Sequence, residues 1–186
     1  MKKNYILAIA GGTCSGKSYL SDYLNFKLSN DFDVVVFHMD AYFRKPFSTT
    51  IAPITGIEYV EHNHPDVMEI DKLMKDVNKA LDEKHDLIII EGLFALHLAE
   101  IRNKSNLKVF VDLASDERLV RRITRHMSRG DTYEEVTSRY IDTVRFRHAE
   151  LVEPTRWHAD LVVNGTIEAN NGKDVLTSYL ENILSD

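Results

Sequence analysis

Residues 11–18, GGTCSGKS, constrain the fold of this 186-residue chain more than any other segment. They match the pattern G-x-x-x-x-G-K-[ST], in which a glycine-rich turn joins a strand to a helix and wraps backbone N–H groups around phosphate oxygens. An apolar segment precedes the match at residues 5–10, and a helical pattern follows it at residues 19–28. Because the motif requires this strand–turn–helix context, the segment predicts a nucleotide-binding loop.

Each position of this phosphate loop has an expected role. The expected nucleotide-binding residues are Gly11, Gly12, Thr13, Cys14, Ser15, Gly16, Lys17 and Ser18. Lys17 would place a positive charge beside the β- and γ-phosphates of ATP or GTP, which makes it a catalytic candidate, and the hydroxyl of Ser18 can bind Mg²⁺. Cys14 is the single cysteine, so an intramolecular disulfide is excluded, and we interpret it as a small side chain at a variable loop position.

Composition and charge exclude several classes of protein. The net charge of −6 argues against a nucleic-acid partner, which requires a broad basic surface. No segment approaches the roughly 20 apolar residues of a membrane-spanning helix. We therefore expect a single cytoplasmic domain over residues 1–186 that acts on a small molecule, without a nucleic-acid or membrane partner.

Continuous apolar segments bounded by polar turns predict strands that are buried on both faces. These segments are residues 5–10, 34–38, 87–90, 107–113 and 160–163. Helical patterns lie between or after them, at residues 67–81, 133–144 and 174–184, and Thr132 with Glu135 predicts a capping box before the second of these. The alternation predicts an α/β fold: an open parallel sheet of about five strands with helices on both faces and ligands at the carboxyl ends of the strands.

Two acidic residues are expected at the same edge of the sheet as the phosphate loop. Asp40 lies just beyond the second predicted strand, and Glu91 ends the third, in LIIIEG. A carboxylate at this edge can hold Mg²⁺ or accept a proton from an attacking hydroxyl. Both residues also have a structural interpretation, Asp40 as the N-cap of a short helix beginning at Ala41 and Glu91 as a partly exposed charge at a strand end.

Four arginines recur at helical spacing after the fourth predicted strand. They are Arg118, Arg122, Arg125 and Arg129. Their spacing places them on one stripe of a helix, which Ser115 is expected to cap. We expect the opposite, apolar side to pack on the core; it comprises Leu119, Val120, Ile123 and Met127. Arginine suits forked contacts with phosphate oxygens, so we predict a helical lid at about residues 118–139, with a solvated cationic face as the alternative.

The irregular segment 42–66 is long for an inert connection, and we predict that it is a substrate-binding flap. Asp66 lies at its end, in His64-Pro65-Asp66. Its carboxylate can cap the following helix together with Glu69, or it can accept hydrogen bonds from the two hydroxyls of a vicinal diol. The spacing is compatible with both roles.

Taken in order, these motifs resemble the uridine kinase and phosphoribulokinase family of P-loop kinases from Ile6 to about Gly165. The matching segments are GGTCSGKS, MDAYF, HNHPD, LIIIEGLFAL, FVDLASDERLVRRITRHMSRG and TVRFRHAELVEPTRWHADLVVNG. The resemblance implies transfer of the γ-phosphoryl group of ATP or GTP to the 5′-hydroxyl of a nucleoside, with Mg²⁺ as cofactor. It also implies assembly as a homo-oligomer.

The resemblance further implies a role for each matching side chain. Asp40 would be the catalytic base and would lie near the metal, which Ser18 and Glu91 would hold. Asp66 would bind the ribose hydroxyls, with Phe43 and Arg122 also in the substrate site. Two further arginines of the stripe, Arg125 and Arg129, would contact the nucleotide.

The chain departs from the family pattern where the family recognises the base. Relatives carry a hairpin between the helix after HPD and the EG strand, whereas here only residues 82–86 connect them. Arg139 stands where relatives use a glutamine, Phe43 lacks a tyrosine hydroxyl, and Asp131 stands where a further arginine is expected. The acceptor could therefore be nicotinamide riboside or another small alcohol. A nucleotide-binding regulatory protein without metabolite turnover is the alternative from another class, although the D-x-x-G motif of GTPases is absent.

Overall fold

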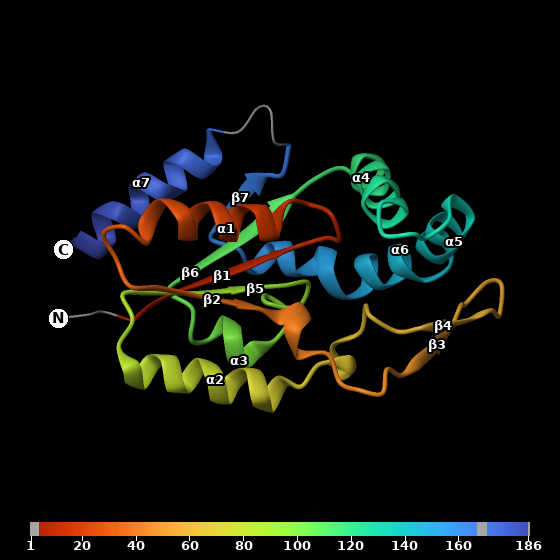
Figure 1. Cartoon of the computed structure of the whole chain (residues 1–186), viewed down its shortest axis with the longest axis horizontal. Helices are drawn as coiled ribbons and strands as arrows, with labels where there is room; N and C mark the ends of the chain where they lie inside the picture. The colour runs from red at the N-terminus through yellow and green to blue at the C-terminus, as the bar shows by residue number, and fades with distance from the viewer. Residues whose placement is uncertain (1–3, 167–170, 186) are drawn as a thin grey trace.

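The computed structural model describes residues 4–166 and 171–185. In these residues five parallel strands form one sheet in the order β2-β5-β1-β6-β7. The strands are β1 (Tyr5–Gly11), β2 (Val34–His38), β5 (Leu87–Glu91), β6 (Leu107–Asp112) and β7 (Leu161–Asn164). All five predicted strands are therefore confirmed, and their carboxyl ends point to the right in Figure 1.

Helices cover both faces of the sheet. Successive side chains of a strand point to opposite faces, so each buried strand has apolar side chains for helices to pack on at both faces. From β1, Leu7 and Ile9 pack with α1 (Lys17–Leu28) and α7 (Gly172–Ser185). Ile6 and Ala8 pack on the other face with α2 (Ile70–Glu83) and α3 (Ala99–Arg102). Each face thus has its own apolar core, and Figure 1 shows the helices above and below the sheet. No helix of the described residues is long and apolar enough to cross a membrane.

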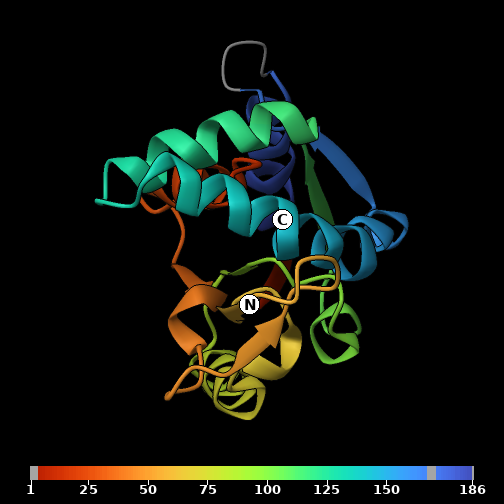
Figure 2. The same cartoon turned by 90° about the vertical axis from the view of Figure 1, so that its right-hand side faces the viewer.

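Two helical segments rise beyond the carboxyl edge of the sheet, where the lid is predicted. The helix α4 (Ser115–Met127) is followed by a long helical segment with π-helical turns. This second segment comprises α5 (Tyr133–Arg139), η3 (Tyr140–Val144), α6 (Arg145–Arg147) and η4 (His148–Val152), before the 3₁₀ turns of η5 (Glu153–His158). Figure 2 shows α4 and the second segment side by side.

The capping box is confirmed, since Thr132 and Glu135 each accept a hydrogen bond from the other's backbone N–H. The helical pattern predicted over residues 133–144 is also confirmed, since α5 begins at Tyr133 and η3 continues to Val144. One detail of the lid prediction is wrong. Ala114, not Ser115, is the N-cap of α4, because the helix begins one residue earlier than expected.

A small hairpin occupies the predicted flap. It consists of β3 (Thr49–Ile51) and β4 (Glu58–Val60), which pair antiparallel between the 3₁₀ turns η1 (Met39–Tyr42) and η2 (Pro65–Val67). The helix expected from residue 67 begins at Ile70 instead, because the chain first makes the η2 turn. Only residues 84–86 separate α2 from β5, so the connection is as short as the sequence indicates.

Buried carboxylates connect this hairpin to the second helical segment. Asp142 is 7% exposed, and its Oδ2 accepts hydrogen bonds from the hydroxyls of Thr55 and Tyr59, both at 2.9 Å. The guanidinium of Arg147 contacts the buried carboxylate of Glu61 at 3.1 Å. The hairpin and the second helical segment are therefore joined by charged hydrogen bonds.

Candidate active site

The phosphate loop has the backbone geometry that its motif predicts. Gly16 adopts φ 102°, a left-handed conformation that glycine reaches without the steric cost of a side chain. Lys17 follows at the start of α1 and is 7% exposed. Among the described residues it pairs with no carboxylate. A largely buried ammonium without a counter-charge favours an anionic ligand at this place.

The side chains of Ser18 and Glu91 meet at the carboxyl edge of the sheet. The Ser18 hydroxyl lies 3.2 Å from both carboxylate oxygens of Glu91, which is buried, so the interpretation of Glu91 as a partly exposed charge is wrong. His38 Nδ1 contacts Glu91 Oε1 at 2.8 Å, a neighbour that the sequence did not single out. Hydroxyl and carboxylate oxygens are the hard donors that Mg²⁺ uses when substrate phosphates complete its shell, so this pair fits the predicted metal.

Asp40 lies at the same edge but outside this pair. It sits inside η1, which begins at Met39 with His38 as its N-cap, so Asp40 does not cap a helix from Ala41. Its side chain is exposed, and within the described residues no three carboxylate, imidazole or thiolate groups gather as a metal cluster. Gly92 supports this turn: a Cβ there would lie 2.6 Å from the Cβ of the buried Met39. The glycine of the EG pair thus lets η1 pack against the end of β5.

The arginine stripe of α4 faces the phosphate loop. Arg118 and Arg122 are the buried residues of this helix, and Arg122 Nη1 donates to the hydroxyl of Thr13 at 3.1 Å. Arg125 Nη2 reaches the same oxygen at 3.5 Å. The alternative of a solvated cationic face is therefore wrong for Arg118 and Arg122. Arg129, one turn further, is exposed, and no hydrogen bond from its side chain to the loop is found in the described residues.

The orientation expected for the apolar side of α4 is wrong. Val120 is 63% exposed and Met127 is 48% exposed, whereas Leu119 and Ile123 are only partly buried. The reason is that α4 crosses above the phosphate loop instead of packing on the sheet. On the side that faces the loop its neighbours are polar atoms, to which the arginines can donate hydrogen bonds and the apolar side chains cannot.

Four of the five buried side-chain polar atoms that lack a hydrogen-bond partner in the described residues surround this loop. They are Ser15 Oγ, Arg118 Nη1, Arg122 Nε and His148 Nδ1. Buried polar atoms are normally paired, so these atoms offer hydrogen-bonding positions that a bound phosphate or ordered water can satisfy. Burial lowers the pKa of Arg122, and the positive charges of Arg125 and Arg139 lower it further.

His148 is a neighbour of the loop that sequence reasoning missed. Its ring and the guanidinium of Arg118 lie 3.0 and 2.7 Å from where a Cβ on Gly12 would be, and its Nε2 contacts Glu153 at 3.0 Å. Burial lowers the pKa of His148, and Arg118 lowers it further. The residue lies in a π-helical turn, where the usual helical periodicity gives no signal.

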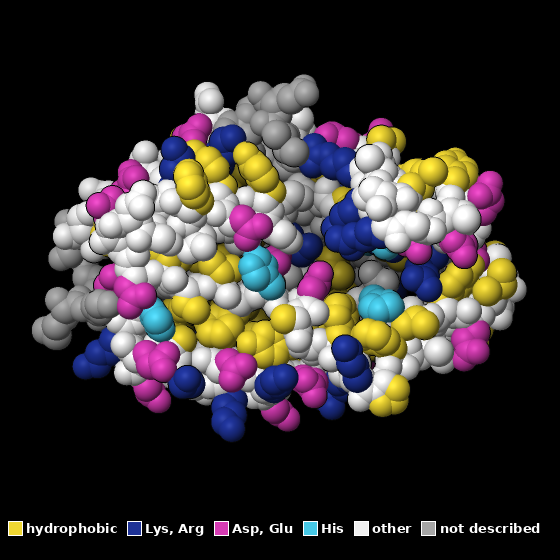
Figure 3. Space-filling view, in the orientation of Figure 1, with side chains coloured by type: hydrophobic (Ala, Val, Ile, Leu, Met, Phe, Trp, Pro, Cys, Tyr) yellow, Lys and Arg dark blue, Asp and Glu magenta, His cyan; other side chains and the backbone are white. Residues whose placement is uncertain are grey.

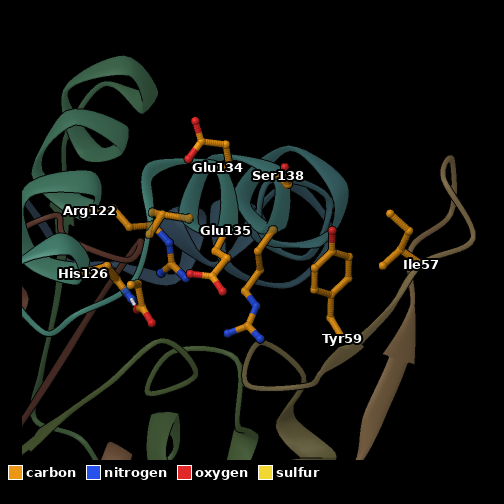
Figure 4. A pocket seen from close by; sticks show the side chains of 10 residues that line it. Ile57, Tyr59, Arg122, His126, Glu134, Glu135 and Ser138 are labelled. Atoms are coloured by element: carbon orange, nitrogen blue, oxygen red, sulfur yellow. Dashed lines mark hydrogen bonds and ion pairs between the residues drawn. The ribbon is translucent and has the colours of Figure 1, made fainter.

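A pocket of about 400 Å³ lies between the lid and the hairpin. Figure 4 shows Arg122 and His126 entering it from α4 and Tyr59 from the opposite side. Arg139 also lines it, with its guanidinium 5.7 Å from the centre of the Tyr59 ring. In Figure 3, cationic side chains border the upper edge of the hollow at this end, and hydrophobic and histidine side chains border its lower edge.

Of the predicted substrate-binding residues, Arg122 and Arg139 line this pocket, whereas Asp66 is not among the lining residues. Asp66 is exposed, and it does not cap α2, whose N-cap is Glu69. Instead its backbone N–H donates to His64 Nδ1, and its carboxylate lies 3.4 Å from the same atom. Asp131, which stands where an arginine was expected, pairs with His126 at 2.7 Å. The carboxylate of Asp66 therefore remains open to solvent and to a ligand.

Comparison with known proteins assigns the family. Residues 57–170 match the model of the Phosphoribulokinase / Uridine kinase family. The chain belongs to this family. Its relatives include the uridine kinase of Lactococcus lactis subsp. lactis (strain IL1403), which is 29% identical over 100% of both chains, and the uridine kinase of Staphylococcus epidermidis (strain ATCC 35984), also 29% identical over 100% of this chain and 99% of the relative.

Solved structures share the fold of this Phosphoribulokinase / Uridine kinase family member. The phosphoribulokinase from Rhodobacter spheroides superimposes with a TM-score of 0.63 at 16% identity, over 88% of this chain and 71% of that one. A shikimate kinase from Bacteroides thetaiotaomicron gives a TM-score of 0.54 at 16% identity, over 98% and 99%. The prediction of a P-loop kinase fold is therefore confirmed.

Proposed function

We propose that this chain is a nucleoside kinase, which transfers the γ-phosphoryl group of ATP to the 5′-hydroxyl of uridine or cytidine with Mg²⁺ as cofactor. The names of the full-length relatives support the substrate class. The structural observation that carries the proposal is the set of unpaired, buried cationic and polar atoms around the phosphate loop. Arg122, which carries one of these atoms, also lines a pocket large enough for a small acceptor.

In this proposal Lys17, Arg122 and Arg125 bind the phosphate oxygens and stabilise the charge that develops on the transferring group. Arg122 and Arg125 already reach the loop through Thr13. Ser18 and Glu91 would hold Mg²⁺, which supplies electrostatic stabilisation of the phosphates when bound. The arginines come from a separate helix, so closure of that helix would also exclude water from the reacting phosphate.

Asp40 is proposed to orient the acceptor hydroxyl and to take its proton. The hydroxyl oxygen forms a bond to the γ-phosphorus, the bond from that phosphorus to the β–γ bridging oxygen breaks, and ADP leaves with the electron pair. The proton passes to the Asp40 carboxylate. Exposure of Asp40 at the carboxyl edge of β2 leaves it accessible to such a hydroxyl.

The test is ADP release with ATP and Mg²⁺ over a panel of acceptors: uridine, cytidine, nicotinamide riboside, adenosine, ribose, ribulose 5-phosphate and pantothenate. We expect strong stimulation by uridine or cytidine. Asp40→Asn should lower turnover by about 10²- to 10⁴-fold with ATP binding, measured calorimetrically, nearly unchanged. Asp31→Asn, at another exposed aspartate, is the matched control. A flat panel would refute nucleoside kinase activity, and wild-type turnover in Asp40→Asn would refute the role of the base.

A further inference from the structure

His38 is the last residue of β2, and its side chain lies beside Glu91, which ends β5. The two residues are paired in register between these parallel strands, so their side chains point to the same face of the sheet. His38 Nδ1 lies 2.8 Å from Glu91 Oε1. An ionised carboxylate can only accept hydrogen bonds, so Nδ1 carries the hydrogen and donates it to Glu91. The imidazole is thus bonded to one of the two proposed ligands of Mg²⁺.

The hydrogen bonds to Glu91 make its two carboxylate oxygens unequal. The side chain is only 3% exposed, and in the described residues only Ser18 and His38 are found to donate to it. The Ser18 hydroxyl lies 3.2 Å from both oxygens and therefore does not distinguish them. His38 contacts Oε1 alone. Oε1 is thus held by a short hydrogen bond, whereas Oε2 has only the longer contact with Ser18 and keeps lone pairs for a cation.

The other edge of the imidazole faces α1. Nε2 lies 3.6 Å from Asp22 Oδ1, and both side chains are in contact with solvent, so this second contact is weak. The backbone of His38 is also the N-cap of η1, which contains Asp40. One residue therefore adjoins both the proposed metal ligand and the turn that carries the proposed base.

A purely structural role for His38 would be to tie the ends of β2 and β5 together. The same two strands carry such a pair at their amino ends, where His85 Nδ1 lies 3.0 Å from Asp33 Oδ1. The phosphate loop follows the carboxyl end of β1, so the His85 pair lies at the opposite edge of the sheet. The two pairs have the same chemistry and join the same strands, but only the His38 pair adjoins the nucleotide site.

We propose that His38 is a positioning residue that acts through Glu91: its Nδ1–H holds Oε1 and so leaves Oε2, with the Ser18 hydroxyl, for Mg²⁺. Hydrogen-bond partners of this kind orient metal-binding carboxylates, and their loss typically costs about 10- to 100-fold in metal affinity or activity. This inference rests on the proposed kinase function, because that function requires the metal.

The first experiment measures by calorimetry the affinity for a non-hydrolysable ATP analogue, once with excess Mg²⁺ and once with EDTA. The ratio of the two affinities reports on the metal site without any turnover. His38→Ala should lower this ratio by about tenfold or more and leave the affinity in EDTA unchanged. His38→Asn, whose side-chain amide nitrogen can replace Nδ1 as the donor, should recover most of the loss.

His85→Ala is the matched control, because it removes the equivalent pair at the amino ends of the same strands. It should keep the wild-type ratio. An unchanged ratio in His38→Ala, or an equal loss in His85→Ala, would overturn the positioning role. A loss in His38→Ala that appears equally in EDTA would overturn it too, because the damage would then lie in the phosphate loop and not at the metal.

The second experiment asks whether His38 acts through Glu91. In a Glu91→Gln background the carboxylate is gone, so adding His38→Ala should change the ratio by less than about twofold. A further tenfold loss in that background would overturn the proposal. Asp22→Ala should keep the wild-type ratio, and a tenfold loss there would assign the effect to Nε2 and overturn the role of Nδ1. A wild type that phosphorylates no nucleoside would overturn the proposed function itself, whereas the binding ratios would still decide the role of His38.

Discussion

Removal of the Asp142 carboxylate should loosen the flap hairpin without unfolding the sheet. The carboxylate is buried and accepts two hydroxyl hydrogen bonds, from Thr55 and Tyr59. Hydrogen bonds to a charged group contribute about 1.5–3 kcal/mol each. Thr55 is exposed, so its freed hydroxyl regains water, and we place the combined loss in Asp142→Ala at about 2–3 kcal/mol.

Hydrogen exchange of the β3 and β4 backbone amides measures this loss directly. A change of about 2–3 kcal/mol corresponds to roughly 30- to 150-fold faster exchange in the hairpin, with the central strands unaffected. Asp76→Ala is the matched control, because Asp76 accepts the hydroxyl of Tyr42 at the same distance of 2.9 Å, away from the hairpin. Unchanged exchange in the hairpin would refute the fastening role of Asp142, and uniform acceleration through the sheet would show that Asp142 stabilises the whole fold.

Three further changes test other contacts. Gly92→Ala forces the new Cβ against Met39 and should displace the turn that carries Asp40. In steady-state kinetics kcat should then fall by about tenfold or more while KM for ATP stays the same. A wild-type kcat would show that Gly92 does not position this turn. The pKa of His148 lies below the usual 6.5, so the unfolded chain binds the proton first and the free energy of unfolding falls as the pH drops through 6.5. Denaturant titrations from pH 8 to 5 should give a smaller fall in His148→Gln than in the wild type. An identical fall would contradict a lowered pKa of His148. Met127→Gln should change the free energy of unfolding by less than about 0.5 kcal/mol, whereas a loss of 2 kcal/mol would mean that this face of α4 is buried after all.

The sheet could be predicted from the sequence because a strand that is buried on both faces appears as a continuous apolar segment. The strand β5 is buried along its whole length and appears in the sequence as LIIIE. The orientation of α4 could not be predicted in the same way. Periodicity separates its arginine side from its apolar side, but the inward side depends on whether the neighbour is a sheet or a polar loop. Here Arg122 meets Thr13, so the charged side turns inward.

The remaining parts of the site left weaker signals. The flap hairpin has strands of three residues, too short for a pattern of alternation. His148 lies in a π-helical turn, where spacings of three and four no longer identify a shared face. Its neighbours Gly12 and Arg118 are brought to it by the tertiary fold.

Because the hairpin is attached to the second helical segment, the binding of ATP and the binding of the acceptor should be coupled. The pocket in which we propose that the acceptor binds has one wall on the hairpin, at Tyr59, and another on α4 and α5, at Arg122 and Arg139. Because Arg122 also bonds the phosphate loop, nucleotide that orders the lid would order the same walls that hold the acceptor. Thermodynamic reciprocity then requires that the acceptor tighten ATP binding by the same factor by which ATP tightens acceptor binding. An enzyme built this way would order these helices in part when ATP binds and most fully when both ligands are bound.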